Sequence, residues 1–467
     1  MDIVDLARLQ FALTTVLHFV FVPISIGLSL LIAIMETLYV VKKNELYKKM
    51  ARFWGNFLLI NFAVGIVTGI LQEFQFGMNW SDFSRFVGDV FGAPLAIEAL
   101  LAFFLESTFI GLWVFGWERL SKRVHLACMW LVSIGTMLSA LWILAANSFM
   151  QRPVGYVINN GRAEMTDIMA LLTNGQLLWE FPHTLFAAFA TGAFLVTGIS
   201  AWKLVRKQEV AFFTSSFKIG ITVALISSLA IAQFGHGQAQ YLVETQPMKM
   251  AASEGLWETS DDPAAWTVIA SINPEDQTNS YELKIPYILS FLSYSKFSGA
   301  VPGMKDLQAE YEQTYGPGNY IPPVRTTFWS FRIMIASGSM MIVLGLYGAY
   351  LAIRRKLGNP NKLFMRLMFA AIALPFIGNT AGWVMTEVGR QPWTVFGLLR
   401  TEDSVSLNVS SGQLLFSVIS FTTVYLLLLC LTAYLFARVA RKGTIEEHQE
   451  RDKDDPFDQG DDSIALK

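Results

Sequence analysis

Charged residues are scarce in this sequence. Asp, Glu, Lys and Arg make up 15% of its 467 residues, against roughly 25% in a soluble globular chain. Hydrophobic residues reach 53% and aromatic residues 13%. So little charge argues against an ordinary water-soluble domain and favours an integral membrane protein. The formal net charge of −2 averages basic connections with an acidic tail, so it indicates no particular partner, and we expect no nucleic-acid ligand.

Cysteine is nearly absent as well. The two cysteines, Cys128 and Cys430, lie in apolar segments, and the sequence has no Cys-x-x-Cys or Cys-x-x-Cys-His motif. Disulfide frameworks, zinc fingers and covalently attached c-type haem are therefore not expected. A basic N-terminal region is missing too, because Asp2 and Asp5 precede the first apolar segment. That segment is too long for a signal-peptide core, so we expect it to be a retained membrane span.

Mostly uncharged segments recur along the chain, and each is near or above the roughly 20 residues that a helix needs to cross hydrocarbon. We count nine of them, at about 9–35, 53–72, 90–117, 126–151, 181–202, 219–235, 333–353, 367–386 and 404–437. Lipid leaves no backbone polar group unpaired at low cost, so all nine should be helices. The sequence therefore predicts an all-α integral membrane protein with nine transmembrane helices.

Lysine and arginine gather in alternate connections between these segments, which predicts the orientation. By the positive-inside rule those connections are cytoplasmic. The N-terminus is then outside and the C-terminus cytoplasmic, which requires an odd number of spans. The basic residues are Lys42, Lys43, Lys48, Lys49 and Arg52; Arg119, Lys122 and Arg123; Lys203, Arg206, Lys207 and Lys218; Arg354, Arg355, Lys356, Lys362 and Arg366; and Arg438, Arg441 and Lys442.

The chain divides into four parts on this prediction. Residues 1–234 carry helices 1–6, residues 235–327 form an outer loop, and residues 328–440 carry helices 7–9. Residues 441–467 are rich in Asp and Glu and read as a disordered cytoplasmic tail. The outer loop contains scattered prolines and glycines, so we expect short helices joined by turns.

Ionisable side chains inside the spans are few, and each costs roughly 2.5 to 3.5 kcal/mol on insertion scales. They are His18, Glu98, Glu106 and His183, with Glu387 closing the eighth span. At roughly 1.5 Å per helical residue, His18, Glu98, His183 and Glu387 lie towards the outer face, and Met334 lies at a depth similar to that of His183. Haem iron takes His, Met, Cys thiolate or Tyr side chains as axial ligands. A His/Met pair makes a six-coordinate electron-transfer centre, whereas a single ligand leaves a position open for O₂. A hydrogen-bonded packing histidine and a packing methionine are the alternatives.

Two further groups of residues leave alternatives open. Glu98 and Glu106, with Ser107 beside them and Ser139 on the next span, form a ladder that could relay protons, or a pair of carboxyls satisfied by neighbouring helices. Arg390 lies three residues after Glu387, on the same face if the helix continues. It could bind a haem propionate or extend to the membrane interface.

Three motifs carry a resemblance to a known family. They are Ala93-Pro94-Leu95-Ala96-Ile97-Glu98 with Phe104-Leu105-Glu106-Ser107-Thr108, then Phe328-Trp329-Ser330-Phe331-Arg332-Ile333-Met334, and Glu387-Val388-Gly389-Arg390-Gln391-Pro392-Trp393. With these motifs in this order, the sequence resembles subunit I of cytochrome bd quinol oxidases over essentially its whole length. The outer loop lacks the long insertion of some members, so it resembles the short-loop branch.

The resemblance implies haem ligands and residues around them. His183 and Met334 would ligate a low-spin haem b. His18 and Glu387 would each hold one of two high-spin haems, a haem b and a haem d, and both assignments occur in the family. Glu98 would lie close to that pair, and Trp383 and Arg390 would line it. Residues on the implied proton route from the cytoplasm are Glu106, Ser107 and Ser139.

The resemblance also implies the reaction. Lys249 and Glu254, in the segment Lys249-Met250-Ala251-Ala252-Ser253-Glu254, match the quinol-binding segment, although a lone Lys and Glu in a loop would otherwise be solvated surface. Menaquinol or ubiquinol would be oxidised at the outer face. Electrons would pass through low-spin haem b to the high-spin pair, where O₂ becomes water with protons from the cytoplasm. The setting would be the bacterial cytoplasmic membrane, with lipid around the chain.

The implied partners are oxidase subunit II and a small single-helix subunit. Two other classes of function compete with this interpretation. A secondary transporter or ion channel would also carry buried Glu and His, but its sites lie at the midplane between matching broken helices. A haem protein without turnover is the other alternative, and the open ligand position expected at a high-spin haem argues against it.

Overall fold

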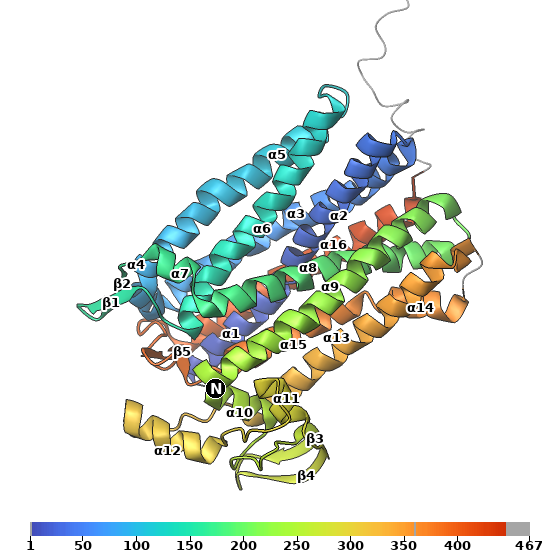
Figure 1. Cartoon of the computed structure of the whole chain (residues 1–467). Coiled ribbons are helices and arrows are strands. Elements are labelled where there is room, and N and C mark those ends of the chain that lie inside the picture. Colours follow the sequence, from blue (N-terminus) through green and yellow to red (C-terminus); the bar gives the residue numbers. More distant parts are fainter. Residues whose placement is uncertain (1, 359–360, 445–467) are drawn as a thin grey trace, which may run out of the picture.

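Nine membrane-length apolar helical spans dominate the computed structural model, which describes residues 2–358 and 361–444 (Figure 1). The predicted all-α class and number of spans are confirmed within those residues, while the acidic tail beyond residue 444 lies outside them. The spans are α1 (Ile3–His18) with α2 (Phe21–Lys42); α3 (Glu45–Met78); α4 (Ser81–Ile97), η1 (Glu98–Phe103) and α5 (Phe104–Phe115); α6 (Lys122–Gln151); α8 (Gly175–Val205); α9 (Val210–Thr245); α13 (Val324–Ile353); α14 (Lys362–Ala370) with α15 (Ala373–Val388); and α16 (Ser411–Lys442).

Three of these spans are interrupted, and two of the interruptions adjoin candidate site residues. The first span breaks at Phe19 and Val20, directly after His18. The third contains η1, a π-helix that begins at Glu98. The eighth breaks between α14 and α15. Irregular turns inside membrane helices are tolerated where they are buried in protein, and π segments recur at functional sites.

Helix α8 lies at the centre of the bundle, with 78% of its most apolar window buried, a larger share than in the other described spans. It contacts α2, α6, α9, α14 and α15. Its approach to α2 is close because two glycines face each other: a Cβ added at Gly192 would lie 2.5 Å from the carbonyl carbon of Gly27. Lipid provides no hydrophobic drive for helix association, so small residues that let backbones touch are a main source of stability.

Residues 246–323 form a small folded cap on one end of the bundle (Figure 1). The cap consists of α10 (Pro247–Glu254), the hairpin β3 (Trp266–Asn273) and β4 (Thr278–Ile285), α11 (Ile288–Tyr294) and α12 (Met304–Tyr315). Its own hydrophobic core includes Met250, Leu289, Met304 and Tyr320. The predicted short helices are present, but the hairpin was not predicted. The cap is also shorter than the predicted outer loop, because α9 continues to Thr245 and α13 already begins at Val324.

The remaining short elements lie in the connections. Between α6 and α8 are the hairpin β1 (Tyr156–Asn159) and β2 (Arg162–Met165) and the short helix α7 (Ile168–Leu172). Between α15 and α16 is the hairpin β5 (Trp393–Val395) and β6 (Leu399–Arg400), and the 3₁₀ turn η2 (Lys356–Gly358) follows α13. Both hairpin connections lie at the same end of the bundle as the cap, called the loop end below (Figure 1).

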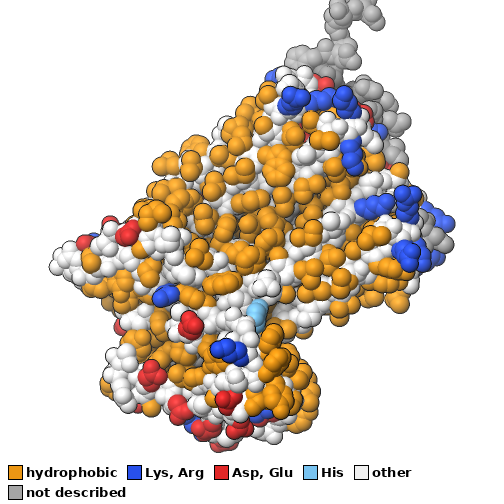
Figure 2. Space-filling model, viewed as in Figure 1, with side chains coloured by type: hydrophobic (Ala, Val, Ile, Leu, Met, Phe, Trp, Pro, Cys, Tyr) orange, Lys and Arg blue, Asp and Glu red, His pale blue; other side chains and the backbone are white. Residues whose placement is uncertain are grey.

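The two ends of the bundle differ in charge. In Figure 2 lysine and arginine gather at the end opposite the cap, called the basic end below, and a band of hydrophobic side chains separates the two ends. The N-terminus lies at the loop end in Figure 1. Helix α16 closes at the basic end with Arg441 and Lys442 in its last turn.

The contact between α2 and α8 gives a stability prediction. Gly192→Ala places a methyl group against the backbone of α2, so the two helices must separate; overpacking of this kind costs about 1 to 3 kcal/mol. We expect a lower thermal unfolding midpoint for the detergent-purified protein. The matched control is Gly111→Ala in α5, where an added Cβ meets no atom within 4 Å. Equal midpoints for the two variants would show that this contact does not limit stability.

Candidate functional site

A cavity of about 110 Å³ inside the loop end brings His183 and Met334 together from α8 and α13. Trp383 of α15 lines the same cavity, as does Phe19 from the break in the first span. The sequence pattern could only suggest that these ligand types lie at similar depth. The fold now places an imidazole and a thioether on the walls of one cavity.

The His183 ring has a defined hydrogen-bond partner. Its Nδ1 lies 3.1 Å from the carbonyl oxygen of Ile231, and because a carbonyl only accepts, Nδ1 carries the proton. The Nε2 lone pair is therefore left for a metal, the arrangement found for ligating histidines. Glycines make room for both candidate ligands: a Cβ at Gly235 would lie 3.0 Å from His183 Cε1, and one at Gly382 would lie 2.9 Å from Met334 Sδ.

His18 is held in a similar way at the C-terminal end of α1. Its Nδ1 lies 3.0 Å from the Thr68 hydroxyl oxygen. Thr68 donates its own proton to the carbonyl oxygen of Gly65, 2.9 Å away, so it accepts from His18 and leaves the His18 Nε2 free. The neighbouring Phe19 packs edge to face on Trp383 with ring centroids 5.5 Å apart. The His18 site therefore adjoins the cavity that holds His183 and Met334.

Glu387 lies at the end of α15, where Gly389 caps the helix. One carboxylate oxygen accepts from Asn147 Nδ2 and from Gln151 Nε2, each at 3.1 Å. The other forms an ion pair with Arg390, which confirms that the two side chains share a face. Arg390 is buried, and its Nη1 has no hydrogen-bond partner among the described residues. Its Nη2 pairs with Glu387 and its Nε donates to the carbonyl oxygen of Trp393, so Nη1 is the nitrogen available to donate to a haem propionate.

The glutamates of the third span are aligned by the π-helix. Eight residues of regular α-helix overshoot two full turns by roughly 80°, but a π segment rotates less per residue because each N–H bonds five residues back. The overshoot between Glu98 and Glu106 is therefore reduced. Both meet α6: Ser139 donates to Glu98, and a Cβ at Gly135, one turn away, would lie 2.7 Å from Glu106 Cγ.

Ser107 is not part of this row of contacts. Its hydroxyl donates to the carbonyl oxygen of Phe104 in its own helix, 3.3 Å away. Glu106 is buried, and its Oε1 has no hydrogen-bond partner among the described residues. The structure therefore aligns Glu98, Ser139 and Glu106 but turns the Ser107 hydroxyl back on the backbone.

Lys249 and Glu254 are buried in α10, with 2% and 1% of their surface exposed, so they are not the solvated surface residues that a loop position suggests. Glu254 forms an ion pair of 2.6 Å with Arg332 of α13. Lys249 Nζ donates to the side-chain oxygen of Gln151 at 2.5 Å. Between them, Met250 lines the cavity that holds His183 and Met334. The segment α10 therefore lies directly against that cavity.

Burial changes the protonation of both residues. Desolvation, reinforced by the positive charge of Arg390, lowers the pKa of Lys249 to about 7, although Glu387 and Glu180 act in the opposite direction. Desolvation raises the pKa of Glu254, while the Arg332 charge opposes the shift. A lysine with a pKa near neutrality can bind or release a proton at physiological pH.

Sequence reasoning missed Glu180, a buried carboxyl in the same cavity. Gln176 donates to its Oε2 at 3.1 Å, and its Oε1 has no hydrogen-bond partner among the described residues. Glu180 falls one residue before the predicted start of its span, so it was not counted among the intramembrane carboxyls. Its position one turn before His183 on α8 was the available signal.

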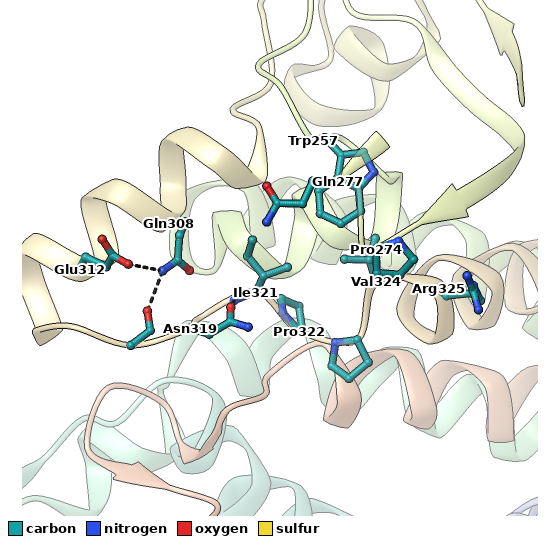
Figure 3. A pocket seen from close by; sticks show the side chains of 12 residues that line it. Trp257, Pro274, Gln277, Gln308, Glu312, Asn319, Ile321, Pro322, Val324 and Arg325 are labelled. Carbon is teal, nitrogen blue, oxygen red and sulfur yellow. Dashed lines mark hydrogen bonds between the residues drawn. The ribbon is translucent and has the colours of Figure 1, made fainter. Parts of the chain in front are cut away.

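A second pocket, of about 730 Å³, opens on the cap (Figure 3). Its wall includes Trp257, Ile321 and Arg325. On one side Gln308 Nε2 donates to Glu312 Oε1 at 2.9 Å and to the carbonyl oxygen of Gly318 at 2.7 Å. None of the predicted site residues lines this pocket.

The chain is similar to known proteins over nearly its whole length. The model of the family described as cytochrome bd terminal oxidase subunit I matches residues 6–444. The chain is 62% identical over 456 residues to cytochrome bd ubiquinol oxidase subunit 1 of Bacillus subtilis, covering 97% of each. It is 40% identical over 500 residues to cytochrome bd-II ubiquinol oxidase subunit 1 of Escherichia coli, covering 95% of this chain and 97% of the relative.

The fold has a solved counterpart. The structure of bd oxidase from Geobacillus thermodenitrificans superposes with a TM-score of 0.86 at 29% sequence identity, covering 95% of this chain and 99% of that chain.

The nine-span helical fold and the relatives it matches define a class, the multi-helix membrane oxidoreductases. More narrowly, the chain belongs to the cytochrome bd terminal oxidase subunit I family. It is a multi-pass protein of the bacterial cytoplasmic membrane, part of a multi-subunit quinol:O₂ oxidoreductase of the respiratory chain. The family membership decides against a transporter or channel, the alternative that the sequence left open.

The low pKa of Lys249 gives a pH prediction. Between pH 7 and about 10.5, the ordinary lysine value, the unfolded chain holds a proton on Lys249 that the folded chain lacks. The contribution of Lys249 to stability therefore rises with pH across that window. We expect Lys249→Met to remove this part of the pH dependence of the thermal unfolding midpoint. Lys305→Met, at a partly exposed lysine of the cap, is the control and should leave the profile unchanged. A wild-type-like profile for Lys249→Met would contradict the assignment.

Proposed function

We propose that the cap faces the outside of the cell and that the basic end faces the cytoplasm. The support is the gathering of lysine and arginine at the basic end, which the positive-inside rule assigns to the cytoplasm (Figure 2). The N-terminus would then be outside and the C-terminus cytoplasmic. Quinol would be oxidised on the outer side, where α10 lies.

The observation that carries the haem assignment is the convergence of His183 and Met334 on one cavity from helices far apart in the sequence. We infer that they would hold a low-spin haem b, because imidazole and thioether are both ligands of haem iron and a pair of them suits an electron-transfer haem. His18 and Glu387 would each hold one of the two high-spin haems, a haem b and a haem d. When bound, these groups supply one-electron transfer and the site of O₂ reduction.

The residues of the chain have defined tasks in this proposal. Ile231 and Thr68 fix the ring orientations of the two histidines, and ligands held in this way lose little entropy on binding. Arg390 would neutralise a propionate through its unpaired Nη1. Trp383 lines the cavity with His183 and packs on Phe19 beside His18, so it would exclude water between the two sites.

Quinol oxidation releases two protons and two electrons, and α10 has groups suited to the protons. Lys249, with its pKa near 7, is a proton acceptor at physiological pH. Glu254 is held by Arg332, which lies two residues before Met334. The ion pair therefore connects the quinol-binding segment to the turn of α13 that would supply a ligand to the first electron acceptor.

Protons consumed in water formation would arrive from the cytoplasm past Glu106, Ser139 and Glu98. Ser139 of α6 donates to Glu98. The Glu106 side chain lies against Gly135, one turn earlier on α6. Because quinol protons leave on the outer side, charge separates across the membrane without a pump. Each elementary charge moved stores about 2.3 kcal/mol per 100 mV.

The chain would assemble with oxidase subunit II and a small single-helix subunit. Large apolar side chains on α5 and α16 remain exposed in the isolated chain, including Phe115, Phe416 and Tyr434. Lipid and neighbouring subunit helices both match such surfaces.

The ligand proposal is tested by spectroscopy. We expect His183→Ala and Met334→Ala each to abolish the low-spin haem b signal in the reduced-minus-oxidised visible spectrum, because six-coordination needs both ligands. Met340→Ala on α13 is the control, since Met340 is half exposed and lies outside the cavity. An intact low-spin signal in both ligand variants would refute the assignment.

The quinol segment is tested by kinetics. We expect Lys249→Ala and Glu254→Ala to lower kcat/KM for quinol by at least about tenfold, the effect of losing one buried hydrogen bond to a charged group. The haem spectrum should keep its bands, which shows that the protein is folded. Lys305→Ala is the control on the cap. Unchanged kinetics in both α10 variants would remove this segment from the quinol site.

A further inference from the structure

Gln151, the last residue of α6, lies between the quinol-binding segment and the candidate haem ligand of α15. Its side chain is fully buried. Its Oε1 accepts from Lys249 Nζ at 2.5 Å, and its Nε2 donates to Glu387 Oε1 at 3.1 Å. A single amide therefore contacts both functional groups.

The orientation of this amide follows from the chemistry of its neighbours. The Lys249 nitrogen faces it as a donor, and an ionised Glu387 carboxylate can only accept. The amide oxygen must then face Lys249 and the amide nitrogen Glu387. Flipping the amide would leave both contacts without a hydrogen bond, and a buried polar group without a partner is costly. Glutamine is suited to this position because it carries a donor and an acceptor on one planar group.

Neighbouring residues hold both ends of the bridge that the Gln151 amide forms between Lys249 and Glu387. Gln246, directly before α10, donates to the backbone oxygen of Gln151 at 2.7 Å and to its Oε1 at 3.3 Å. Asn147, one turn earlier on α6, donates to the same Glu387 oxygen as Gln151 does. Arg390 pairs with the other oxygen. The end of α6 therefore sets the position of α10 and the orientation of the Glu387 carboxylate together.

We propose that Gln151 is a positioning residue that couples the quinol-binding segment to the carboxylate of Glu387. The inference rests on the proposed roles of Lys249 and Glu387. A displacement of Lys249 when quinol binds is transmitted through the amide to the orientation of the carboxylate. Quinol occupancy and the high-spin haem site are thereby linked through one side chain.

Two substitutions separate the halves of the bridge. Gln151→Glu keeps an acceptor for Lys249 but replaces the donor that faces Glu387 with a like charge. We expect quinol KM to stay within about twofold of wild type, less than the effect of one lost hydrogen bond, while the high-spin haem absorption bands shift. Gln151→Leu removes both contacts. It should raise quinol KM on the order of tenfold and shift the same bands.

The controls separate coupling from misfolding. Gln208→Leu, at an exposed glutamine of the basic end, should leave KM and spectrum unchanged. The low-spin haem bands and the thermal unfolding midpoint report whether each Gln151 variant is folded. Quinone-analogue titration of the high-spin bands gives a readout independent of turnover: wild type should respond to the analogue, and Gln151→Leu should not.

Three results would overturn the inference. They are unchanged KM and bands in both variants, an equal rise in KM for Gln151→Glu and Gln151→Leu, and a wild-type response of Gln151→Leu to the quinone analogue. Lys249→Ala and Glu387→Ala distinguish this failure from failure of the proposed function. If those two variants are impaired while Gln151 variants behave as wild type, only the coupling is wrong. If they also behave as wild type, the proposed function is wrong.

Discussion

The burial of α10 is the constraint on which the loop end depends. A short helix that carries a lysine and a glutamate into a dry environment needs a partner for each, because an unpaired buried charge is far more costly than the pair is stabilising. Arg332 of α13 meets Glu254, and Gln151 of α6 meets Lys249. Once those contacts form, the cap is fixed on the bundle and Met250 closes the side of the His183 and Met334 cavity.

Glycines, which lack a side chain, make the space inside the bundle for close helix contacts and for the candidate ligands. Gly27 and Gly192 let α2 and α8 touch, while Gly235 and Gly382 clear the room around His183 and Met334. Glycine therefore has two opposite effects here. At one pair of positions it lets two helices touch, and at the other pair it leaves empty space beside a candidate ligand. A well-packed membrane bundle needs both, since its packing is close and its cavities have to be built.

Much of the fold was predictable because its signals are local. Runs of apolar residues predicted the spans, and the basic connections gather at one end of the bundle as predicted. The spacing of Glu387 and Arg390 predicted that their side chains share a face, but not that they form an ion pair. The hairpin of β3 and β4 was missed since its alternation is weak in a segment rich in turn residues. Glu180 was missed because each predicted span was taken to end at the nearest charged residue. A carboxyl group at the end of a span was therefore counted as lying outside it.

Tertiary contacts were the part of the site that no local pattern could supply. From their position in a loop, Lys249 and Glu254 would be expected to be solvated. They are buried because α10 packs against α6 and α13. The role of Gln151 depends on a Lys and a Glu from two other elements, so nothing around residue 151 in the sequence indicates it. The hydroxyl of Ser107 shows the converse, since its side chain bonds to its own helix.

The π-helix of the third span has a consequence for how this protein can change. Relative to regular helix, such a segment behaves as an extra residue accommodated within the turn. Deleting any one residue between Glu98 and Glu106 would let the helix relax to ordinary geometry and rotate one carboxyl away from α6. Point substitutions with apolar residues leave the count intact. Exchange of the exposed Leu100 or Leu101 for another apolar residue therefore keeps both carboxyls on α6, whereas a change in the length of this stretch does not.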